Sequence, residues 1–312
     1  MSNSEYLYTR DAYGKTLVEL GRADSNVVVL DADLSGSTRT AMFAKEFPDR
    51  FFNFGVAEQN MMASAAGLAS CGKIVFVSTF AMFATARVLD QIRNSVCYND
   101  CNVKIVATHA GITVGEDGAS HQALEDVAFL RAIPGMKIIV PCDAEETKDA
   151  VIAAYRNKGP FYIRLGRSKV PVIPDKKEFA VGKAYVIREG EDVAILSCGI
   201  MVWEALKAAK ILENKNISVT VANIHTIKPV DEGFIVNLAK KHKGLVVCEE
   251  HQIIGGLYSA VCEVLSSKYP KKISPVGIQD IFGQSGAPEE LMKKYGLSAE
   301  AIADKAAGTL QD

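Results

Sequence analysis

The sequence predicts an α/β fold made of two domains, and three observations lead to this prediction. Short β-rich runs alternate with helical patterns along most of the 312 residues, which is typical of parallel sheets joined by crossover helices. Hydrophobic residues make up 48% of the chain, enough for well-packed cores in two domains of ordinary size. A polar, proline-containing segment at residues 168–177 separates two such series and is a poor candidate for either regular element.

The two series define the expected elements and the domain boundaries. In the first series we expect helices at 57–69 and 84–98, a helical pattern beginning near Gln122, and strands at 26–30, 51–54, 73–78, 103–108, 137–140 and 161–165. In the second we expect helices at 201–213, 232–241 and 256–267 between strands at 192–197, 218–223, 244–248 and 273–278. We therefore place one domain at 1–170, a linker at 171–185 and a second domain at 186–312.

Composition narrows the class of protein. The chain has 35 Lys and Arg against 37 Asp and Glu, so its charge does not indicate a nucleic-acid or membrane-surface partner. The amino terminus lacks a basic region followed by an apolar core, and no apolar run approaches the roughly 18 residues that span a bilayer, so we expect a cytoplasmic protein. The seven cysteines lack CxxC spacing and are expected to be reduced core thiols. Cys97 and Cys101 are four residues apart, but no second ligand pair for zinc follows them.

The stretch Gly-Glu-Asp-Gly-Ala-Ser-His-Gln at residues 115–122 is the strongest local indication of a functional site. It follows the strand expected at 103–108, and its glycines let the backbone turn tightly while a carboxylate and an imidazole come close together. A cation held by Glu116, Asp117 and His121 would lack further well-spaced ligands. A hydrolase built on Ser120 and His121 is disfavoured because adjacent residues rarely face each other productively.

Glu58, Phe80 and Phe83 each have an ordinary structural interpretation. Glu58 begins an expected helix, where a carboxylate is favoured by the helix dipole and would serve as a capping charge. Phe80 and Phe83, three residues apart where a strand passes into a helix, would by themselves be core aromatics. In the second domain, His242 lies among lysines and is expected on the solvated surface. Gly255-Gly256 is expected to open a helix after a turn, with an anion cradle as the alternative.

Two segments resemble the pyrimidine-binding half of transketolase. They are Phe-Gly-Val-Ala-Glu-Gln-Asn at residues 54–60 and Thr-His-Ala-Gly-Ile-Thr-Val-Gly-Glu-Asp-Gly-Ala-Ser-His-Gln at residues 108–122. The similarity extends from about Arg10 to the end of the chain and fits the carboxyl-terminal subunit of a transketolase split into two polypeptides. It implies a parallel-sheet pyrimidine-binding domain followed by a smaller transketolase C-terminal-like α/β domain with a structural or assembly role.

The resemblance implies thiamine diphosphate as cofactor and assigns three residues to it. Glu58 would hydrogen-bond the aminopyrimidine ring nitrogen and drive the imino tautomer that removes the thiazolium proton. A carboxyl group shared with a ring nitrogen in an apolar pocket would keep its proton, because burial disfavours the charged form. Phe83 would stack on the pyrimidine beside Phe80, whereas Ala86 stands where longer transketolases carry a further aromatic.

The resemblance also implies a sugar phosphate as substrate. Asp117 and His121 would contact sugar hydroxyls near the reacting carbons, with His121 assisting proton transfer during cleavage. The phosphate would be held by guanidinium forks and hydroxyl donors, and Asp33 would border the same pocket. The residues implied in phosphate binding are Arg10, Ser37, His109 and Arg167.

One motif of this family has no counterpart in the chain. Thiamine-diphosphate enzymes hold the diphosphate through a divalent metal bound by a Gly-Asp-Gly segment and a later Asn, and Gly115-Glu116-Asp117-Gly118 is not that motif. The resemblance therefore implies an amino-terminal transketolase subunit that supplies the diphosphate domain and most of the Mg2+ site, in an α2β2 heterotetramer. The implied reaction is transfer of a two-carbon ketol unit from a ketose phosphate to an aldose phosphate in the pentose phosphate pathway.

Two other hypotheses remain open. A deoxyxylulose-phosphate synthase or the beta subunit of a 2-oxoacid dehydrogenase belongs to the same superfamily, but His109 and its spacing to Gly115 favour transketolase. The hypothesis from another class is a non-catalytic regulatory or scaffolding subunit. The presence of Glu58, Asp117, His121 and Arg167 argues against it.

Overall fold

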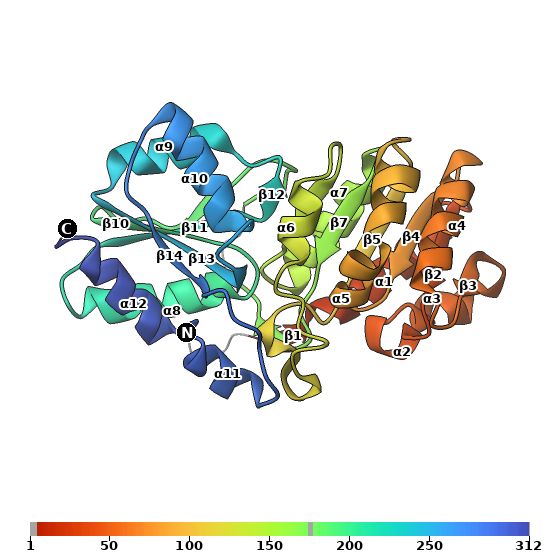
Figure 1. Ribbon diagram of the computed structural model, residues 1–312, viewed down its shortest axis with the longest axis horizontal. Helices are drawn as coiled ribbons and strands as arrows, with labels where there is room; N and C mark the ends of the chain where they lie inside the picture. Colours follow the sequence, from red (N-terminus) through yellow and green to blue (C-terminus); the bar gives the residue numbers. More distant parts are fainter. Residues whose placement is uncertain (1–4, 174–176, 312) are drawn as a thin grey trace.

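The computed structural model describes residues 5–173 and 177–311 and has two main sheets, each flanked by helices on both faces (Figure 1). The larger sheet has seven strands, of which only the edge strand β12 is antiparallel to its neighbour. Their spatial order is β12 (Thr226–Lys228), β6 (Lys137–Ile139), β7 (Phe161–Arg164), β5 (Val103–Ala107), β4 (Ile74–Ser78), β2 (Val27–Asp31) and β3 (Phe51–Asn53). The two-domain α/β fold predicted from the sequence is confirmed.

Two layers of helices cover the two faces of the larger sheet. Because successive strand side chains point to opposite faces, Val27 and Val29 pack with one helix layer while Val28 and Leu30 pack with the other. One layer comprises α1 (Thr9–Ala23), α3 (Ala41–Glu46) and α7 (Ala144–Arg156), and the other includes α4 (Glu58–Ser70) and α6 (Asp126–Arg131). The short helices α2 (Ser35–Thr38) and α5 (Ala81–Thr85) follow strands β2 and β4.

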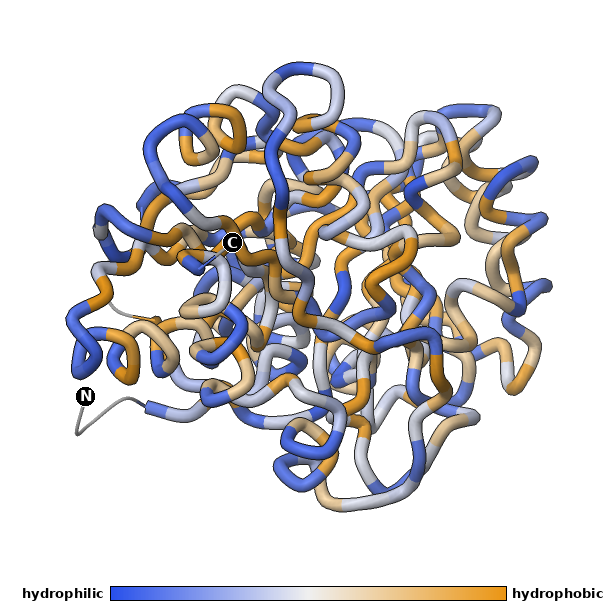
Figure 2. Tube along the Cα trace, turned by 60° about the vertical axis from the view of Figure 1, so that its left-hand side comes forward, coloured by the Kyte–Doolittle hydropathy of each residue, from blue (hydrophilic) through white to orange (hydrophobic). Residues whose placement is uncertain are grey.

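The smaller sheet has five strands, and β9 is its antiparallel edge. Their order is β14 (Ser274–Ile278), β13 (Gly244–Gln252), β10 (Val193–Ser197), β11 (Val219–Asn223) and β9 (Tyr185–Arg188). Helices α8 (Met201–Glu213) and α12 (Ala299–Gly308) cover one face, and α9 (Glu232–Lys241) and α10 (Leu257–Lys268) cover the other (Figure 1). Hydrophobic positions lie mainly along the inner segments, and hydrophilic ones lie mainly on loops and outer helix turns (Figure 2).

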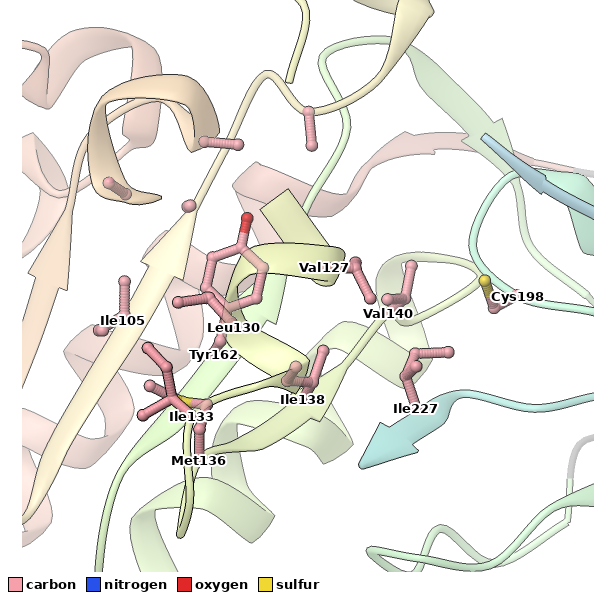
Figure 3. Packing of buried hydrophobic residues seen from close by; sticks show 14 of the residues in the cluster. Ile105, Val127, Leu130, Ile133, Met136, Ile138, Val140, Tyr162, Cys198 and Ile227 are labelled. Carbon is pink, nitrogen blue, oxygen red and sulfur yellow. The ribbon is translucent and has the colours of Figure 1, made fainter. Parts of the chain in front are cut away.

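The two domains are joined by a continuous core and by an exchanged strand. Val127 and Val140 from the first domain pack near Cys198 and Ile227 from the second, within one buried hydrophobic cluster (Figure 3). Strand β12 leaves the second domain and pairs with β6 at the edge of the larger sheet. Both contacts hold the two sheets together, and they place residues of the second domain beside the loop at 112–122.

The structure corrects two expectations about secondary structure in the first domain. The helix expected at 84–98 is broken into the end of α5, a 3-10 turn at Ala86–Val88 and a π-helix at Gln91–Cys97. The Thr85 hydroxyl donates to the Ala81 carbonyl over 2.7 Å, a contact that bends helices. The helix expected near Gln122 begins at Asp126, and residues 118–122 form a turn in which the Gly118 carbonyl accepts from the amides of His121 and Gln122. The Gln122 side chain donates to the carbonyls of Ile112 and Gly115.

The separating segment and two surface assignments also differ from expectation. Lys169–Pro171 forms strand β8, which pairs with β1 (Tyr6–Tyr8), so residues 168–177 are not entirely irregular; residues 174–176 lie outside the described part of the chain. His242 is buried rather than solvated, since its ring bonds to Thr220 and to the carbonyls of Leu238 and Gly190. All seven cysteines are free, but Cys71 is exposed and Cys262 half-buried, so not every thiol belongs to the core.

No helix in the described ranges is both long enough and apolar enough to cross a membrane.

Candidate active site

The residues predicted to form the site follow the carboxyl ends of neighbouring parallel strands. Asp33 and Ser37 follow β2, Glu58 follows β3, Phe80 and Phe83 follow β4, and Arg167 follows β7. His109, Asp117 and His121 follow β5, and Arg10 lies in the first turn of α1, directly after β1. All these loops lie at the carboxyl ends of the strands, on the lower side of the larger sheet in Figure 1. Open α/β sheets bind ligands at this end of their strands.

Glu58 is a buried carboxylate with one charged partner. It occupies the first position of α4, and only 5% of its side chain is exposed. Nη1 of Arg87 donates to its Oε1 over 2.6 Å, whereas 45% of the Arg87 side chain is exposed. The guanidinium of Arg87 is thus the donor to the Glu58 carboxylate in the free chain. The protonated Glu58 expected from the resemblance therefore stays a prediction for the cofactor-bound state.

Phe83 and Glu58 already hold a planar, nitrogen-bearing group between them. The guanidinium carbon of Arg87 lies 4.4 Å from the centroid of the Phe83 ring while its Nη1 reaches Glu58. Phe80 lies nearly parallel to Phe83, with centroids 6.0 Å apart, and the His121 ring meets Phe83 edge-on at 5.3 Å. A carboxylate beside an aromatic face fits a stacked aminopyrimidine, which also presents ring nitrogens in a plane.

The loop at 112–122 brings Asp117 and His121 to the same edge. Gly115 and Gly118 have positive φ angles of 83° and 77°, which confirms the tight bends predicted from the glycines. Nη1 of Arg167 donates to the Glu116 carboxylate over 2.9 Å and lies 3.9 Å from Oδ1 of Asp117. Nδ1 of His121 lies 3.0 Å from the Ser120 hydroxyl. In the described ranges no three His, Cys, Asp or Glu side chains come together as metal ligands.

Three arginines surround His109. Arg10 lies 3.5 Å from Nε2 of His109, and its Nη1 donates to the Ser37 carbonyl over 3.2 Å. The buried Nε of Arg10 has no hydrogen-bond partner among residues 5–173 and 177–311. Burial and the charge of Arg39 lower the pKa of Arg10, so this guanidinium lacks full compensation. Unsatisfied positive charge of this kind fits an anionic ligand such as a phosphate.

His109 is neutral in this cluster. Burial, followed by the charges of Arg10, Arg167 and Arg39, lowers its pKa to about 3. Its ring stacks on Phe80 with centroids 3.9 Å apart, and Nδ1 lies 2.9 Å from the Thr108 hydroxyl. The positive charge near His109 therefore belongs to the arginines, and the imidazole contributes a hydrogen-bonding group.

Asp33 and Ser37 lie on a turn that a buried carboxylate organises. Oδ2 of Asp31 accepts hydrogen bonds from Thr38 and Thr40 over 2.7 and 2.8 Å, and Oδ1 accepts from the Leu34 amide over 2.7 Å. Asp33 itself accepts a bond from the Asn53 amide over 3.2 Å. Ser37 contacts Arg10 through its backbone carbonyl rather than through its hydroxyl.

The second domain holds the loop at 112–122 at two points. Oε1 of the buried Glu250, on β13, accepts a hydrogen bond from the Thr113 amide over 2.7 Å. Nε2 of Gln122 donates to the Gln284 carbonyl over 2.9 Å. Arg164 joins the same region, since its Nη2 donates to the carbonyls of Ala123 and Glu250 over 2.9 and 3.0 Å. The second domain therefore has a structural part in this region: it holds the loop that carries Asp117 and His121.

The Gly255-Gly256 turn opens α10, as expected, and its helix terminus is occupied from within the chain. Both carboxylate oxygens of Glu249 accept bonds from this terminus, one from Leu257 over 2.6 Å and the other from Tyr258 over 2.9 Å. This internal anion leaves the turn as a structural feature.

Sequence reasoning missed Arg87, Arg39 and Glu250 as residues of this site. Arg87 lies four positions after Phe83, a spacing that places both on one face of a helix and gave a usable signal. Arg39 follows Ser37 by two residues in the same turn. Glu250 carries no such signal, because its partner Thr113 is 137 residues away.

Comparison with known proteins assigns a family to both domains. Residues 5–172 match the transketolase pyrimidine-binding domain family, and residues 182–302 match the transketolase C-terminal domain family. The chain is 53% identical over 305 residues to a protein of Methanocaldococcus jannaschii described as a transketolase C-terminal section, covering 96% of this chain and 95% of that protein. It is 42% identical over 296 residues to a 6-deoxy-6-sulfo-D-fructose transketolase subunit of Clostridium sp., covering 95% and 92%.

A solved structure agrees with these relatives. It is a split-gene transketolase described as an inactive beta4 tetramer, with a TM-score of 0.89, 49% identity, and coverage of 98% of this chain and 99% of that one. The resemblance found in the sequence is thereby confirmed along both domains. The chain belongs to the transketolase family, in which it corresponds to the carboxyl-terminal subunit of a split enzyme.

Proposed function

We propose that this chain is the catalytic carboxyl-terminal subunit of a two-polypeptide transketolase that transfers a two-carbon ketol unit between sugar phosphates, in the cytoplasm and within the pentose phosphate pathway. One observation carries the proposal. The Glu58–Phe83 pair and the arginine cluster are linked by neighbouring rings, since the Phe80 ring lies 6.0 Å from that of Phe83 and stacks on His109 at 3.9 Å. A cofactor ring and a phosphorylated substrate can thus be held in one continuous site.

Glu58, Phe80 and Phe83 are the residues we assign to thiamine diphosphate. Glu58 would donate a hydrogen bond to a pyrimidine nitrogen as a neutral acid, and Phe83 would support the ring face, with Phe80 beside it. When bound, this cofactor supplies the electron sink for carbon–carbon bond cleavage, while protein groups orient the reactants. We assign the diphosphate and its Mg2+ to a partner subunit, because this chain matches the pyrimidine-binding and C-terminal domains of transketolase and its sequence has no Gly-Asp-Gly segment.

The substrate would lie between the cofactor residues and the arginines. Arg10 and Arg167 would bind the phosphate, with His109 and the turn at Asp33 and Ser37 beside it. Asp117 and His121 would contact the hydroxyls near the reacting carbons. His121 is the imidazole next to Phe83, so it is the group placed to move a proton at the substrate.

Reconstitution tests this proposal. The measurement is ketol transfer from xylulose 5-phosphate to ribose 5-phosphate by the chain alone, by the amino-terminal subunit alone, and by the two together with thiamine diphosphate and Mg2+. We expect activity only in the mixture, which should sediment as an α2β2 heterotetramer. Glu58→Ala should abolish it, whereas Glu46→Gln, a change in an exposed carboxylate paired with Arg22, should not. Full activity of the Glu58→Ala mixture would refute the proposal.

A second candidate concerns the sugar. The Clostridium relative is named for a sulfo-sugar, and a sulfonate, like a phosphate, is an oxyanion that an arginine cluster can bind. Activity with a 6-sulfo ketose and not with xylulose 5-phosphate would favour it. Turnover of pyruvate with glyceraldehyde 3-phosphate, without activity on ketose donors, would instead favour a deoxyxylulose-phosphate synthase.

A further inference from the structure

We infer that Arg87 takes the place of the cofactor pyrimidine in the free subunit and leaves Glu58 when the cofactor binds. The inference rests on the proposed function, because it requires Glu58 to be the pyrimidine partner. It assigns to Arg87 a positioning role: it keeps the buried carboxylate paired until the cofactor arrives.

The first step of the argument is that one side chain occupies both of the contacts assigned to the pyrimidine. Arg87 Nη1 donates to Glu58 Oε1 over 2.6 Å, and the guanidinium carbon lies 4.4 Å from the centroid of Phe83. A ring stacked on that face and hydrogen-bonded to that oxygen would need the same space. The guanidinium and the pyrimidine are therefore mutually exclusive there.

The second step concerns charge. A buried carboxylate without a partner is costly, so Glu58, with 5% of its side chain exposed, needs a counter-ion when no cofactor is present. Paired with a guanidinium, the carboxyl accepts hydrogen bonds but has no proton to donate. Bond donation to a ring nitrogen requires the pair to separate and the carboxyl to take up a proton.

The third step is that the side chain of Arg87 can move while its backbone stays in place. The Arg87 carbonyl accepts a hydrogen bond from Nε2 of Gln59 over 3.1 Å, which ties this part of the chain to α4 next to Glu58. Its side chain is 45% exposed, so it can turn out into solvent. The exchange therefore needs only new side-chain rotamers of Arg87.

The test compares Arg87→Ala with Arg93→Ala. Arg93 belongs to the same irregular segment, but within the described part of the chain its guanidinium donates only to the exposed side chain of Asn94, so it is a matched control. Equilibrium binding of thiamine diphosphate to the reconstituted mixture is measured by calorimetry in the presence of Mg2+. Arg87→Ala should tighten the apparent Kd by about threefold to tenfold, since an ion pair no longer has to be broken. Arg93→Ala should leave it unchanged.

A thermodynamic cycle on the full chain without cofactor supplies the second readout. Arg87→Ala should lower the melting temperature, and the loss should be smaller when Glu58→Gln is also present, because a neutral amide needs no counter-ion. Arg87→Lys keeps the charge but not the planar fork, so its Kd for thiamine diphosphate should lie between those of the wild type and Arg87→Ala. It also serves as the test variant if Arg87→Ala folds poorly. Unchanged or weaker cofactor binding by both Arg87 variants, or an additive cycle, would overturn the inference.

The outcome is separable from that of the proposed function. Loss of transfer activity in Glu58→Ala with unchanged cofactor affinity in the Arg87 variants rejects only the role of Arg87. Full activity in Glu58→Ala rejects the role of Glu58 itself.

Discussion

Glu250 in the second domain accepts a hydrogen bond over 2.7 Å from the backbone amide of Thr113, at the start of the loop that carries Asp117 and His121. Glu250 is buried, and the main cause acting on its pKa is that burial, which raises it, while the charge of Arg164 lowers it. A carboxylate placed in this way orders the loop without touching a substrate. It gives the second domain a defined part in forming the site.

Glu250→Ala should destabilise the chain and weaken substrate binding. The variant leaves the Thr113 amide buried without its acceptor, which costs about 1–3 kcal/mol in the free energy of unfolding. Glu250→Gln keeps an acceptor oxygen and should lose much less. Urea unfolding of the chain and the KM of the reconstituted enzyme for a ketose phosphate check this. Equal KM values for the two variants would mean that the hydrogen bond does not position the loop.

Gly111→Ala should disturb the hydrogen bond between Glu250 and Thr113 by a change in the first domain. Gly111 has φ 84° and ψ −176°, a backbone conformation that only glycine adopts readily, and a β carbon there would lie 2.2 Å from Cδ of Glu250. The expected loss in the free energy of unfolding is about 1–3 kcal/mol from backbone strain, plus the displacement of Glu250. Gly67→Ala is the control, because Gly67 lies in α4 with no neighbour near its β position and should gain about 0.5–1 kcal/mol. Denaturant midpoints of the two variants should move in opposite directions.

Arg10→Met should raise the KM for phosphorylated sugars selectively. Arg10 has a buried Nε without a hydrogen-bond partner among the described residues and stands beside His109. Hydrogen bonds to charged groups contribute about 1.5–3 kcal/mol, so the KM for a ketose phosphate should rise by about 10- to 100-fold. The same ketose without its phosphate should be turned over with little change. Arg22→Met, an exposed arginine on the same helix, should affect neither substrate.

The free energy of unfolding should decrease as the pH falls from about 6.5 to 4, because His225 takes up a proton more readily in the unfolded chain. Burial lowers its pKa from 6.5 to about 4, and its ring stacks on Phe179 at 4.3 Å, distant in sequence from the site loops. Because the folded pKa lies below the unfolded value, the unfolded chain binds the proton more readily, and stability drops as the pH falls through this window. Above about pH 6.5 the residue contributes no pH dependence.

His225→Phe should remove this part of the pH dependence while retaining a ring against Phe179. One fewer proton taken up on unfolding reduces the slope by up to about 1.4 kcal/mol per pH unit between pH 4 and 6.5. Urea unfolding at several pH values measures the slope. An unchanged slope would show that His225 is protonated equally in both states.

The sequence alone determined the family, through the segments at residues 54–60 and 108–122. Its strand pattern determined the two-domain α/β fold and placed the site residues at the carboxyl ends of the strands. This was possible because parallel strands place their carboxyl ends together, so residues far apart in sequence meet when each follows a strand.

Only the tertiary structure decided the contacts that link separate elements. The pairing of Glu58 with Arg87, the burial of His242 and the placement of β12 in the larger sheet depend on which elements pack together. The bond from Thr113 to Glu250 spans 137 residues and crosses from one domain to the other. Local propensity and periodicity act over a few residues, whereas the energy of a buried charge is set by whatever the complete fold brings beside it.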